Sequence, residues 1–472
     1  MVNLDLNREE RILFLASLWS ELETFYTNTE ELRVSPKLDR KNVIEWIECN
    51  IHSDASTLDR AKDVINGLKQ FAVHTGHPDY FGLFNPRSSF AGIVADLITA
   101  TMNPQMAAWS HAPLAIEIEN YLVQELAKRF GFQIENADGV FCSGGAEANL
   151  TAVLCAVTKS VENFKSNGLL GVTKRPIIYC SEHAHHSIAR AARIVGLGHD
   201  SVVSIKTDDD LRIIPQALDL QIRKDIEQGS APIMIVATAG TTGPGSIDQL
   251  EEIGIIARDQ NLWFHVDGAY GAAIILNENY KSHLKGIEQA DSITFDIHKW
   301  LAVPMAASVF ITSTPDILEE TFGMHADYMP RDSQGMKVID PYMHSIQWSR
   351  RFIGLKLYMS VLFYGWDGIA ALVENYIILG EEFRSAISSK GWNIINSSPL
   401  PVICFVDEQA KGERNNSQQI VSYILETGEA WLSIYPIDGV DTIRVCINNH
   451  MTASANINKL VQLLGEARSS FT

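Results

Sequence analysis

Short apolar runs rich in β-branched residues alternate with helical stretches from about residue 90 to about residue 365 of this chain. Among these runs are residues 176–179, 233–237, 262–266 and 307–311. Strands that are apolar along most of their length, and that are separated by helices, are typical of a mostly parallel sheet covered by helices on both faces. We therefore predict an α/β domain with a mostly parallel central sheet over residues 90–365.

The pattern changes after Gly365. A long helical segment reaches about residue 390, strands follow near residues 402–406 and 442–447, and a helix closes the chain. This order predicts a smaller α+β domain over residues 366–472.

The first segment, residues 1–89, opens with a helical pattern over residues 8–30. Acidic residues dominate its polar positions, so we expect it to pack on a partner subunit or domain and not on a membrane. We interpret residues 1–89 as a helical dimerisation segment. The apolar positions of the pattern are Ile12, Leu15, Leu18, Trp19 and Leu22.

The charge and the cysteine content exclude several classes of protein. The 472-residue chain carries 38 basic and 57 acidic residues, a net charge of −19 that repels nucleic acids and anionic membrane surfaces. Its six cysteines are scattered without paired spacing, so we expect reduced thiols and neither a disulfide framework nor a zinc ribbon. The acidic, polar beginning is unlike a signal peptide, and no apolar stretch is long enough to cross a bilayer. We expect a soluble cytoplasmic protein.

Lys299 occupies an unusual place, because the residues after it, 300–310, are almost wholly apolar. The residues before it, 291–296, alternate in polarity like a half-buried strand. An unpaired ammonium is costly to bury, although a lysine at a strand end can extend its amine to solvent. A lysine that condenses with an aldehyde to form a Schiff base avoids this cost, and pyridoxal phosphate enzymes hold their cofactor in this way. For Lys299 alone, both interpretations stand.

Two further segments carry groups suited to a flat, phosphorylated ligand. Residues 140–149 predict a short strand, a turn at Ser143-Gly-Gly145 and a helix, whose first backbone N–H groups and dipole favour an anion. A plain strand-to-helix turn is the alternative. Residues 182–188 contain three histidines, which suit stacking on a heterocycle, simple packing or, with poor spacing, a zinc site. These are His183, His185 and His186.

Two predicted strands end in polar residues, at the edge where parallel α/β sheets bind ligands. One strand leads into the hydroxyl and glycine residues of segment 237–248, and the next ends at Asp267. A buried carboxylate is costly unless it meets a cation. The protonated ring nitrogen of pyridoxal phosphate is such a cation, and an aspartate is its usual partner. Together with Lys299, these segments supply an anion-binding turn, an aromatic ring for stacking, a carboxylate partner for a pyridinium nitrogen, and an amine.

As an ordered set, these residues resemble the group II pyridoxal-phosphate-dependent amino-acid decarboxylases, a family that includes aromatic-L-amino-acid and glutamate decarboxylases. The similarity extends from about His77 to His450, most of the chain. It implies the fold type I architecture of the aspartate aminotransferases, pyridoxal 5'-phosphate as cofactor, and a homodimer with shared active sites. The segments that carry it are His77-Pro-Asp-Tyr-Phe81, Ser143-Gly-Gly-Ala-Glu-Ala-Asn149, Ala184-His-His-Ser187, Gly240-Thr-Thr242, His265-Val-Asp-Gly-Ala-Tyr270, His298-Lys-Trp300 and Trp348-Ser-Arg-Arg-Phe352.

The resemblance implies roles for individual residues. Lys299 would bind the cofactor aldehyde, Asp267 would pair with the ring nitrogen, and His185 would stack on the ring. Tyr328 matches a mobile-loop tyrosine that returns a proton to the substrate carbon after CO2 leaves, reaching across to the neighbouring subunit. The other implied cofactor contacts are Gly145, Ala146, Thr242, Ala269 and His298, and the implied substrate contacts are Arg444, which would engage the carboxylate, and Trp109.

The chain departs from the family pattern at several positions. Ala146 replaces a serine that many relatives use against the phosphate. Asp296 lies close to the same phosphate in sequence, and we expect it to turn away or to bond a backbone group. Arg87 could add a cation near the substrate pocket, but we expect it instead to be a surface loop residue. The pocket positions that lack the bulky ring wall expected for a catechol or indole are Pro86, Gln105 and Ala107.

The preferred interpretation is α-decarboxylation of an L-amino acid to an amine and CO2. A decarboxylating aldehyde synthase on the same scaffold is the alternative, which Tyr328 disfavours because such relatives often have phenylalanine there. An aminotransferase is disfavoured because the His298-Lys-Trp300 and stacking-histidine set belongs to decarboxylases. A scaffold protein without cofactor and a zinc hydrolase built on the three histidines are further alternatives.

Overall fold

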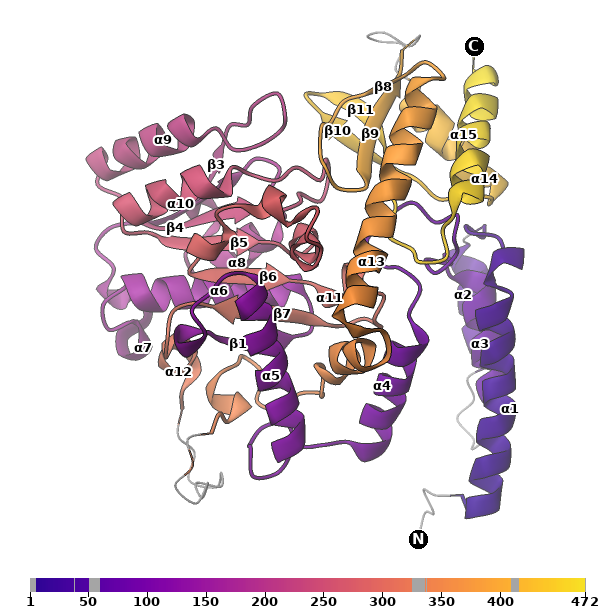
Figure 1. The fold of residues 1–472 in the computed structure, drawn as a ribbon, viewed down its shortest axis with the longest axis horizontal. Coiled ribbons are helices and arrows are strands. Elements are labelled where there is room, and N and C mark those ends of the chain that lie inside the picture. The colour runs from indigo at the N-terminus through magenta and orange to yellow at the C-terminus, as the bar shows by residue number, and fades with distance from the viewer. Residues whose placement is uncertain are drawn as a thin grey trace.

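The larger part of the molecule is built on a seven-stranded sheet. The computed structural model describes residues 6–37, 39–50, 60–324, 336, 338–408 and 416–471. Strand β7 runs antiparallel to both its neighbours, β1 and β6, while the pairs from β6 across to β3 are parallel. The prediction of a mostly parallel sheet is thus confirmed. Across the sheet (Figure 1) the strands are β1 (Asp138–Cys142), β7 (Ser308–Thr312), β6 (Ser292–Phe295), β5 (Trp263–Asp267), β4 (Ala231–Thr238), β2 (Pro176–Ser181) and β3 (Val202–Ile205).

Helices cover both faces of this sheet. Phe141 and Phe264 point to one face and share a buried core with the first group of helices. Val140 and Met234 point to the other face and pack on the second group. Successive strand residues are therefore buried on opposite faces, which explains the continuous apolar runs. The first group is α5 (Pro113–Arg129), α9 (Pro215–Glu227) and α10 (Leu250–Asp259); the second is α6 (Gly145–Ser160), α8 (Ser187–Val195) and α12 (Ile317–Phe322); the short helices are α7 (Phe164–Asn167) and α11 (Ile297–Trp300).

A 34-residue helix, α13 (Leu355–Ser388), runs from the large sheet to a second, smaller sheet (Figure 1). Gly365 interrupts it with a φ of 66°, a conformation that glycine adopts without the steric cost of a side chain. The smaller sheet is antiparallel, in the order β10-β11-β9-β8, and has its own apolar core, as predicted for the end of the chain. Neither α13 nor any other helix within the described ranges combines the length and hydropathy needed to cross a membrane. The remaining elements here are β8 (Trp392–Ile394), β9 (Val402–Asp407), α14 (Ser417–Thr427), β10 (Ser433–Ile437), β11 (Val440–Cys446) and α15 (Ser454–Ser469).

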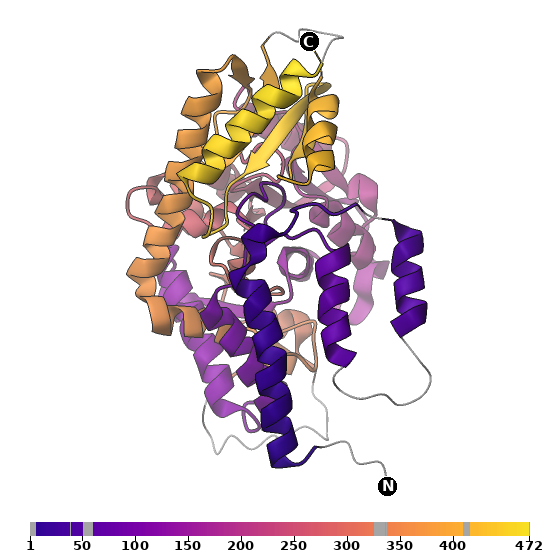
Figure 2. The ribbon, with the colours of Figure 1, turned by 90° about the vertical axis from the view of Figure 1, so that its right-hand side faces the viewer.

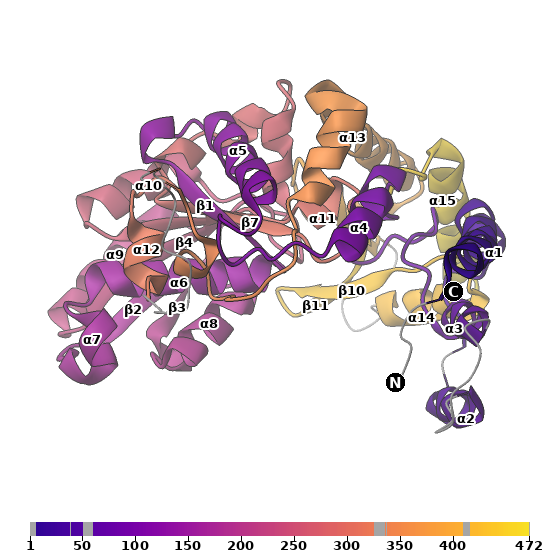
Figure 3. The same cartoon turned by 90° about the horizontal axis from the view of Figure 1, so that it is seen from below.

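The N-terminal helices lie at one side of the molecule, with α4 between them and the large sheet (Figures 1 and 3). Helix α1, which the helical pattern over residues 8–30 predicts, extends along the side of the body (Figure 2) and has no buried residue. Leu13 and Leu15 are 71% and 55% exposed. These apolar side chains of α1 are therefore exposed in the described part of the chain. The helices of this region are α1 (Arg8–Thr27), α2 (Arg40–Asn50), α3 (Ala61–Phe71) and α4 (Phe90–Met102).

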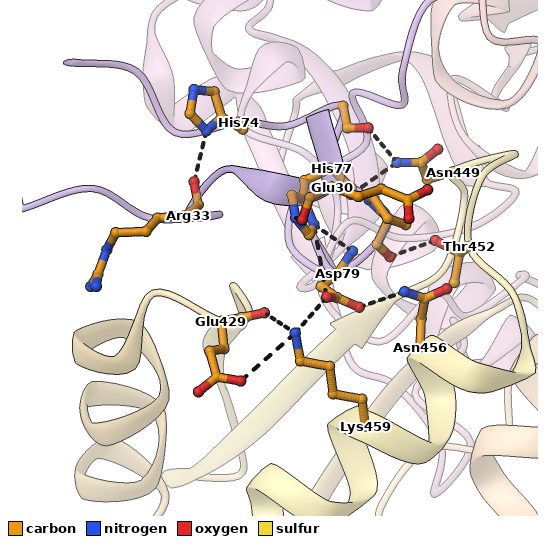
Figure 4. A network of polar contacts seen from close by, with 12 residues as sticks. Glu30, Arg33, His74, His77, Asp79, Glu429, Asn449, Thr452, Asn456 and Lys459 are labelled. Carbon is orange, nitrogen blue, oxygen red and sulfur yellow. Dashed lines mark hydrogen bonds and ion pairs between the residues drawn. The ribbon is translucent and has the colours of Figure 1, made fainter. Parts of the chain in front are cut away.

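A polar network, shown in Figure 4, ties the segment after α3 to the last helix of the chain. The carboxylate of Asp79 accepts hydrogen bonds from Asn456 Nδ2 at 2.7 Å and from Lys459 Nζ at 2.8 Å, both on α15. The backbone N–H of Asp79 donates to His77 Nδ1 at 3.0 Å, and the His77 carbonyl accepts from Asn449 Nδ2 at 3.0 Å. We refer to these five residues as the His77–Asp79 clamp. Buried polar groups thus join two distant parts of the sequence.

Candidate active site

A small cavity lies at the edge of the large sheet where β2, β4, β5 and β6 end. Because these strands are parallel, the residues that follow them come together at that edge. Asp267 is the last residue of β5, Lys299 lies on α11 directly after β6, and His185 follows β2. The cavity is lined by Gly145, Ala146, Asn149, His185, Thr238, Gly240, Thr242, Asp267, Ala269, Tyr270, Asp296 and Lys299.

Lys299 meets a carboxylate in this cavity. Its Nζ lies 2.9 Å from Oδ2 of Asp296, whose side chain is only 4% exposed. The other oxygen, Oδ1, is buried and has no hydrogen-bond partner among the described residues. The expectation that Asp296 turns away or bonds a backbone group is therefore wrong. Strand β6 is buried on both faces and is not half-buried as expected. The Asp296 carboxylate that follows it is therefore buried in the site, where it pairs with Lys299 three residues later.

Asp267 is held from both sides by neutral donors. Its Oδ2 accepts from Asn149 Nδ2 at 2.9 Å, and its Oδ1 accepts from the backbone N–H of Ala269 at 3.1 Å. Asn149 in turn accepts from His265 Nε2 at 3.1 Å. Burial lowers the pKa of His265 to about 4, so its ring is neutral near pH 7. Within the described part of the chain no cation pairs with Asp267, which leaves its charge for a ligand.

His185 lies beside the same cavity, on the loop between β2 and α8. Its Nδ1 accepts from the backbone N–H of Ser187 at 3.2 Å and from the Ser187 hydroxyl at 2.8 Å. That hydroxyl accepts from Asn149 Nδ2 at 2.8 Å, so one asparagine orients both His185 and the carboxylate of β5. Desolvation by the surrounding atoms lowers the pKa of His185, although the residue as a whole is exposed. His183 instead lies 3.0 Å from the hydroxyl of Tyr435 on β10, outside the lining.

The turn at Gly145 forms the floor of the cavity. Helix α6 begins there, and no side chain caps its first turn. A Cβ on Gly145 would come within 3.0 Å of the Asp296 carboxylate, so only glycine permits this close approach. Ala146 lines the cavity next to it. His298 does not line it: the Nδ1 of His298 lies 2.6 Å from the Ala307 carbonyl and its Nε2 lies 3.9 Å from Asp296 Oδ2.

Arg444 lies behind the cavity and outside its lining. Its Nε donates to the carbonyls of Thr242 and Gly243, at 3.0 Å each, and its Nη1 donates to a further backbone carbonyl at 2.7 Å. Its Nη2 is buried and has no hydrogen-bond partner among the described residues. The guanidinium carbon lies 5.0 Å from the centre of the Phe84 ring, and Lys299 Nζ lies 5.2 Å from the same ring. Phe84, which no sequence motif singled out, is thus close to both cations.

Three other residues from the sequence analysis lie elsewhere. The indole N–H of Trp109 donates to Glu117 at 2.7 Å, away from the cavity of its own chain. Arg87 is only 8% exposed, and its guanidinium lies 3.8 Å from the centre of the Tyr26 ring, so the expectation of a surface arginine is wrong. Stacking on this α1 side chain stabilises the buried cation. Tyr328 falls outside the described residues.

Besides Asp296, the lining contains four residues that the sequence analysis did not assign to the site. Of these, Asn149 has the clearest role, because it holds Asp267 and Ser187 together. Its position four residues after Gly145 places it on the same face of α6 as the turn, which is a signal that the sequence does contain. The four residues are Asn149, Thr238, Gly240 and Tyr270.

Known proteins share both the sequence pattern and the fold. The family model for the pyridoxal-dependent decarboxylase conserved domain matches residues 42–407. The chain is 30% identical over 396 residues to an aromatic-L-amino-acid decarboxylase from Bacillus atrophaeus, covering 82% of this chain and 81% of that protein. It is 27% identical over 421 residues to 4-hydroxyphenylacetaldehyde synthase from Rhodiola rosea, covering 86% and 84%. The structure of Oryza sativa TDC with PLP and tryptamine superposes with a TM-score of 0.93 at 21% identity, covering 99% of both chains. Mouse CSAD superposes with a TM-score of 0.90 at 23% identity, covering 98% and 99%.

The fold is therefore that of the fold type I pyridoxal phosphate enzymes. The chain belongs to the pyridoxal-dependent decarboxylase family, and it is a pyridoxal-5'-phosphate-dependent carboxy-lyase that acts on an amino acid. The cavity residues fit this cofactor. Asp267 offers a carboxylate without a cation partner, Lys299 offers an amine, and the uncapped start of α6 offers N–H groups to a phosphate.

Proposed function

We propose that the cavity at the carboxyl edge of the large sheet is the active site, and that it converts an L-amino acid to the corresponding amine and CO2. The observation that carries this proposal is the convergence of the Lys299 amine, the Asp267 carboxylate and the His185 ring on one cavity. These groups match the aldehyde, the ring nitrogen and the ring face of one pyridoxal 5'-phosphate molecule.

The surrounding residues would hold the cofactor. Lys299 would bind the aldehyde carbon and Ala269 would touch the ring, with Gly145, Ala146 and Thr242 around the phosphate. His298 would contribute to phosphate binding from the far side of Asp296, because its Nε2 lies 3.9 Å from the Asp296 carboxylate.

The chemistry that bound pyridoxal 5'-phosphate supplies is an electron sink for the bond pair that CO2 leaves on the substrate Cα. Asp267 favours the protonated ring nitrogen, because a neighbouring carboxylate stabilises the charged form of a base. Asn149 keeps this carboxylate in place, so little reorganisation is needed during the reaction. His185 would lie against the ring face, where it fixes the plane and excludes water.

Arg444 would position the substrate carboxylate. Its Nε and Nη1 are used by backbone carbonyls, so Nη2 is the nitrogen left to donate. Trp109 would contact substrate only across a subunit interface, because it lies away from the cavity of its own chain.

The product distinguishes decarboxylation from aldehyde synthesis. Tyr328 would return a proton to Cα and so release the amine. Purified enzyme supplied with the cofactor should release CO2 and amine in equal amounts, and a screen of L-amino acids for CO2 release identifies the substrate. Equimolar aldehyde and ammonia would instead favour the activity for which the Rhodiola rosea relative is named. The variant Tyr328→Phe should shift the products toward aldehyde, and an unchanged amine yield would remove the proton-donor role.

We further propose that the chain works as a homodimer. A groove of about 570 Å³ between α1, α3 and the segment after Pro86 is lined mainly by apolar side chains, among them Trp19, Phe25 and Phe90. The exposed apolar side chains of α1 continue this surface. A second copy would cover them, so sedimentation should give twice the mass of 52.4 kDa. A fully active monomer would exclude shared active sites.

An absorption spectrum tests the cofactor site directly. The protein supplied with pyridoxal 5'-phosphate should show a visible band that borohydride removes by fixing the cofactor to Lys299, and peptide mapping should locate the modified lysine. Modification of a different lysine would contradict the proposed site.

A further inference from the structure

Asp296 is a carboxylate in the cavity lining that the proposed mechanism does not use. Its Oδ2 lies 2.9 Å from Lys299 Nζ, and its Oδ1 is buried without a hydrogen-bond partner among the described residues. It also borders the start of α6, because a Cβ on Gly145 would be 2.9 and 3.0 Å from the two carboxylate oxygens. Asp296 therefore lies between the amine and the place proposed for the phosphate.

An ionised Asp296 carboxylate would repel a phosphate at that place. Among the described lining residues, the charged or titratable groups are Asp267, Asp296, His185, Lys299 and Tyr270. Burial raises the pKa of the Tyr270 phenol well above its usual value, so this group stays neutral. Lys299 is the cation of this set, and the cofactor aldehyde engages it. A phosphate monoester carries a charge of about −1.5 to −2 near pH 7. Two anions a few ångströms apart in a buried site do not both stay ionised without a counter-charge.

We propose that Asp296 takes up a proton when pyridoxal 5'-phosphate binds, and that the protonated carboxyl then donates a hydrogen bond to the phosphate. Without the cofactor, the Asp296 carboxylate and the Lys299 ammonium neutralise each other. When Lys299 Nζ bonds to the aldehyde carbon, the aldehyde oxygen leaves as water with two of the ammonium protons. The nitrogen keeps one proton and its positive charge, so the proton on Asp296 comes from solvent. This inference rests on the proposed position of the cofactor in the cavity.

The other titratable groups that face Asp296 do not supply the same effect. They are His298 of α11, His185 before α8, and Cys142 of β1. Burial lowers the pKa of both histidines and raises the pKa of the Cys142 thiol well above its usual value. Between about pH 7 and pH 9 both rings therefore stay neutral and the thiol stays protonated.

Titration calorimetry tests the proton count. Pyridoxal 5'-phosphate is titrated into cofactor-free protein at pH 8, in two buffers of different protonation enthalpy. Wild type should take up about one proton more than Asp296→Asn, whose amide keeps the shape and can donate without a proton from solvent. Between pH 7 and pH 9 the wild-type Kd should rise by up to about tenfold more per pH unit than the Kd of the variant. Pyridoxal, which lacks the phosphate, should give equal proton counts for the two proteins.

A matched control and a second comparison keep the test decisive. Asp225→Asn changes a buried carboxylate on α9 that bonds the Tyr179 hydroxyl outside the cavity, and it should keep the wild-type proton count. Wild type alone should take up about one proton more with pyridoxal 5'-phosphate than with pyridoxal, so the test does not depend on a variant that folds. Equal proton counts for wild type and Asp296→Asn with pyridoxal 5'-phosphate would overturn the inference, and so would equal wild-type counts with pyridoxal 5'-phosphate and with pyridoxal. A difference between wild type and Asp296→Asn that persists with pyridoxal would also overturn it.

Failure of the site and failure of this inference have different signatures. Lys299→Ala should remove the visible band of the bound cofactor, and a band that survives would overturn the proposed site. If Lys299→Ala loses the band as expected but wild type and Asp296→Asn take up equal numbers of protons, the proposed site stands. Only the role of Asp296 is then overturned.

Discussion

Two buried clusters of this molecule contain histidine, aspartate and lysine, yet they differ in what their polar atoms contact. In the His77–Asp79 clamp each oxygen of the Asp79 carboxylate accepts a hydrogen bond, and both ring nitrogens of His77 have partners. In the proposed active-site cluster, Asp296 Oδ1 has no hydrogen-bond partner and Asp267 has no cationic partner within the described residues. Asp79 and Asp267 are equally buried, at 4% and 3% exposure. The two clusters are alike in residue types and burial, and the bonding capacity left unused is what distinguishes the proposed active site from the clamp.

Removal of the two lysines gives the largest expected contrast. Lys299→Ala should lower kcat for CO2 release by at least about 1000-fold, or about 4 kcal/mol of activation free energy, because it removes the amine that binds the cofactor. Lys459→Ala in the clamp is the control and should keep kcat. The rate of CO2 release at saturating substrate and cofactor measures both. Substantial activity in Lys299→Ala would show that Lys299 is not the residue that binds the cofactor.

Asp267→Asn should lower kcat by about 100- to 1000-fold, because the amide cannot hold the ring nitrogen in its charged form. The amide has nearly the same shape, so the melting temperature should change little. Rates and thermal melts of the loaded enzyme check both statements. A kcat near that of wild type would show that the charge of Asp267 is not used.

Acid should destabilise both regions by one mechanism. Burial lowers the pKa of His265 and the pKa of His450 to about 4 each. His265 bonds Asn149 in the proposed site, and His450 follows the clamp residue Asn449. Since the unfolded pKa is about 6.5, the unfolded chain binds more protons below that pH. Stability is therefore complete above about pH 6.5 and falls toward pH 4, with each histidine costing about 2 kcal/mol at pH 5.

Urea unfolding at pH 7 and at pH 5 measures this loss. His265→Gln and His450→Gln should each reduce the difference between the two pH values. A variant with the wild-type difference would show that its histidine does not titrate on unfolding in this range.

The clamp should affect stability and not catalysis. Asp79→Asn should lower the free energy of unfolding by about 1–2 kcal/mol, because a buried charged hydrogen bond to Lys459 is lost, while kcat stays within about twofold. Glu429→Gln is the control: Glu429 lies 3.8 Å from the same lysine but is 55% exposed, so the cost should stay below about 0.5 kcal/mol. If Asp79→Asn reduced kcat as much as Asp267→Asn, the distinction between the clusters would fail.

Much of the fold and of the site could be predicted because parallel strands end together. The apolar runs located the strands, and the polar residues after them, Lys299, Asp267 and His185, therefore had to meet at one edge. The reversed direction of β7 could not be predicted, since an apolar run is the same whichever way its strand points.

The wrong expectations concern the partners of charged side chains. Asp296 was expected to avoid the site, but its partner is Lys299 on the next turn. Arg87 was expected at the surface, but the ring of Tyr26 covers it from α1. Such partners depend on rotamers and on the packing of distant elements, which sequence spacing does not determine.

The His77–Asp79 clamp also sets when the chain can finish folding during synthesis. Lys459 lies 380 residues after Asp79. A ribosome that adds about 5–20 residues per second needs about 20–80 seconds to reach it. Until then the nascent N-terminal segment has made Asp79 but not its cationic partner. Docking of this segment is therefore a late event, completed only when α15 leaves the exit tunnel.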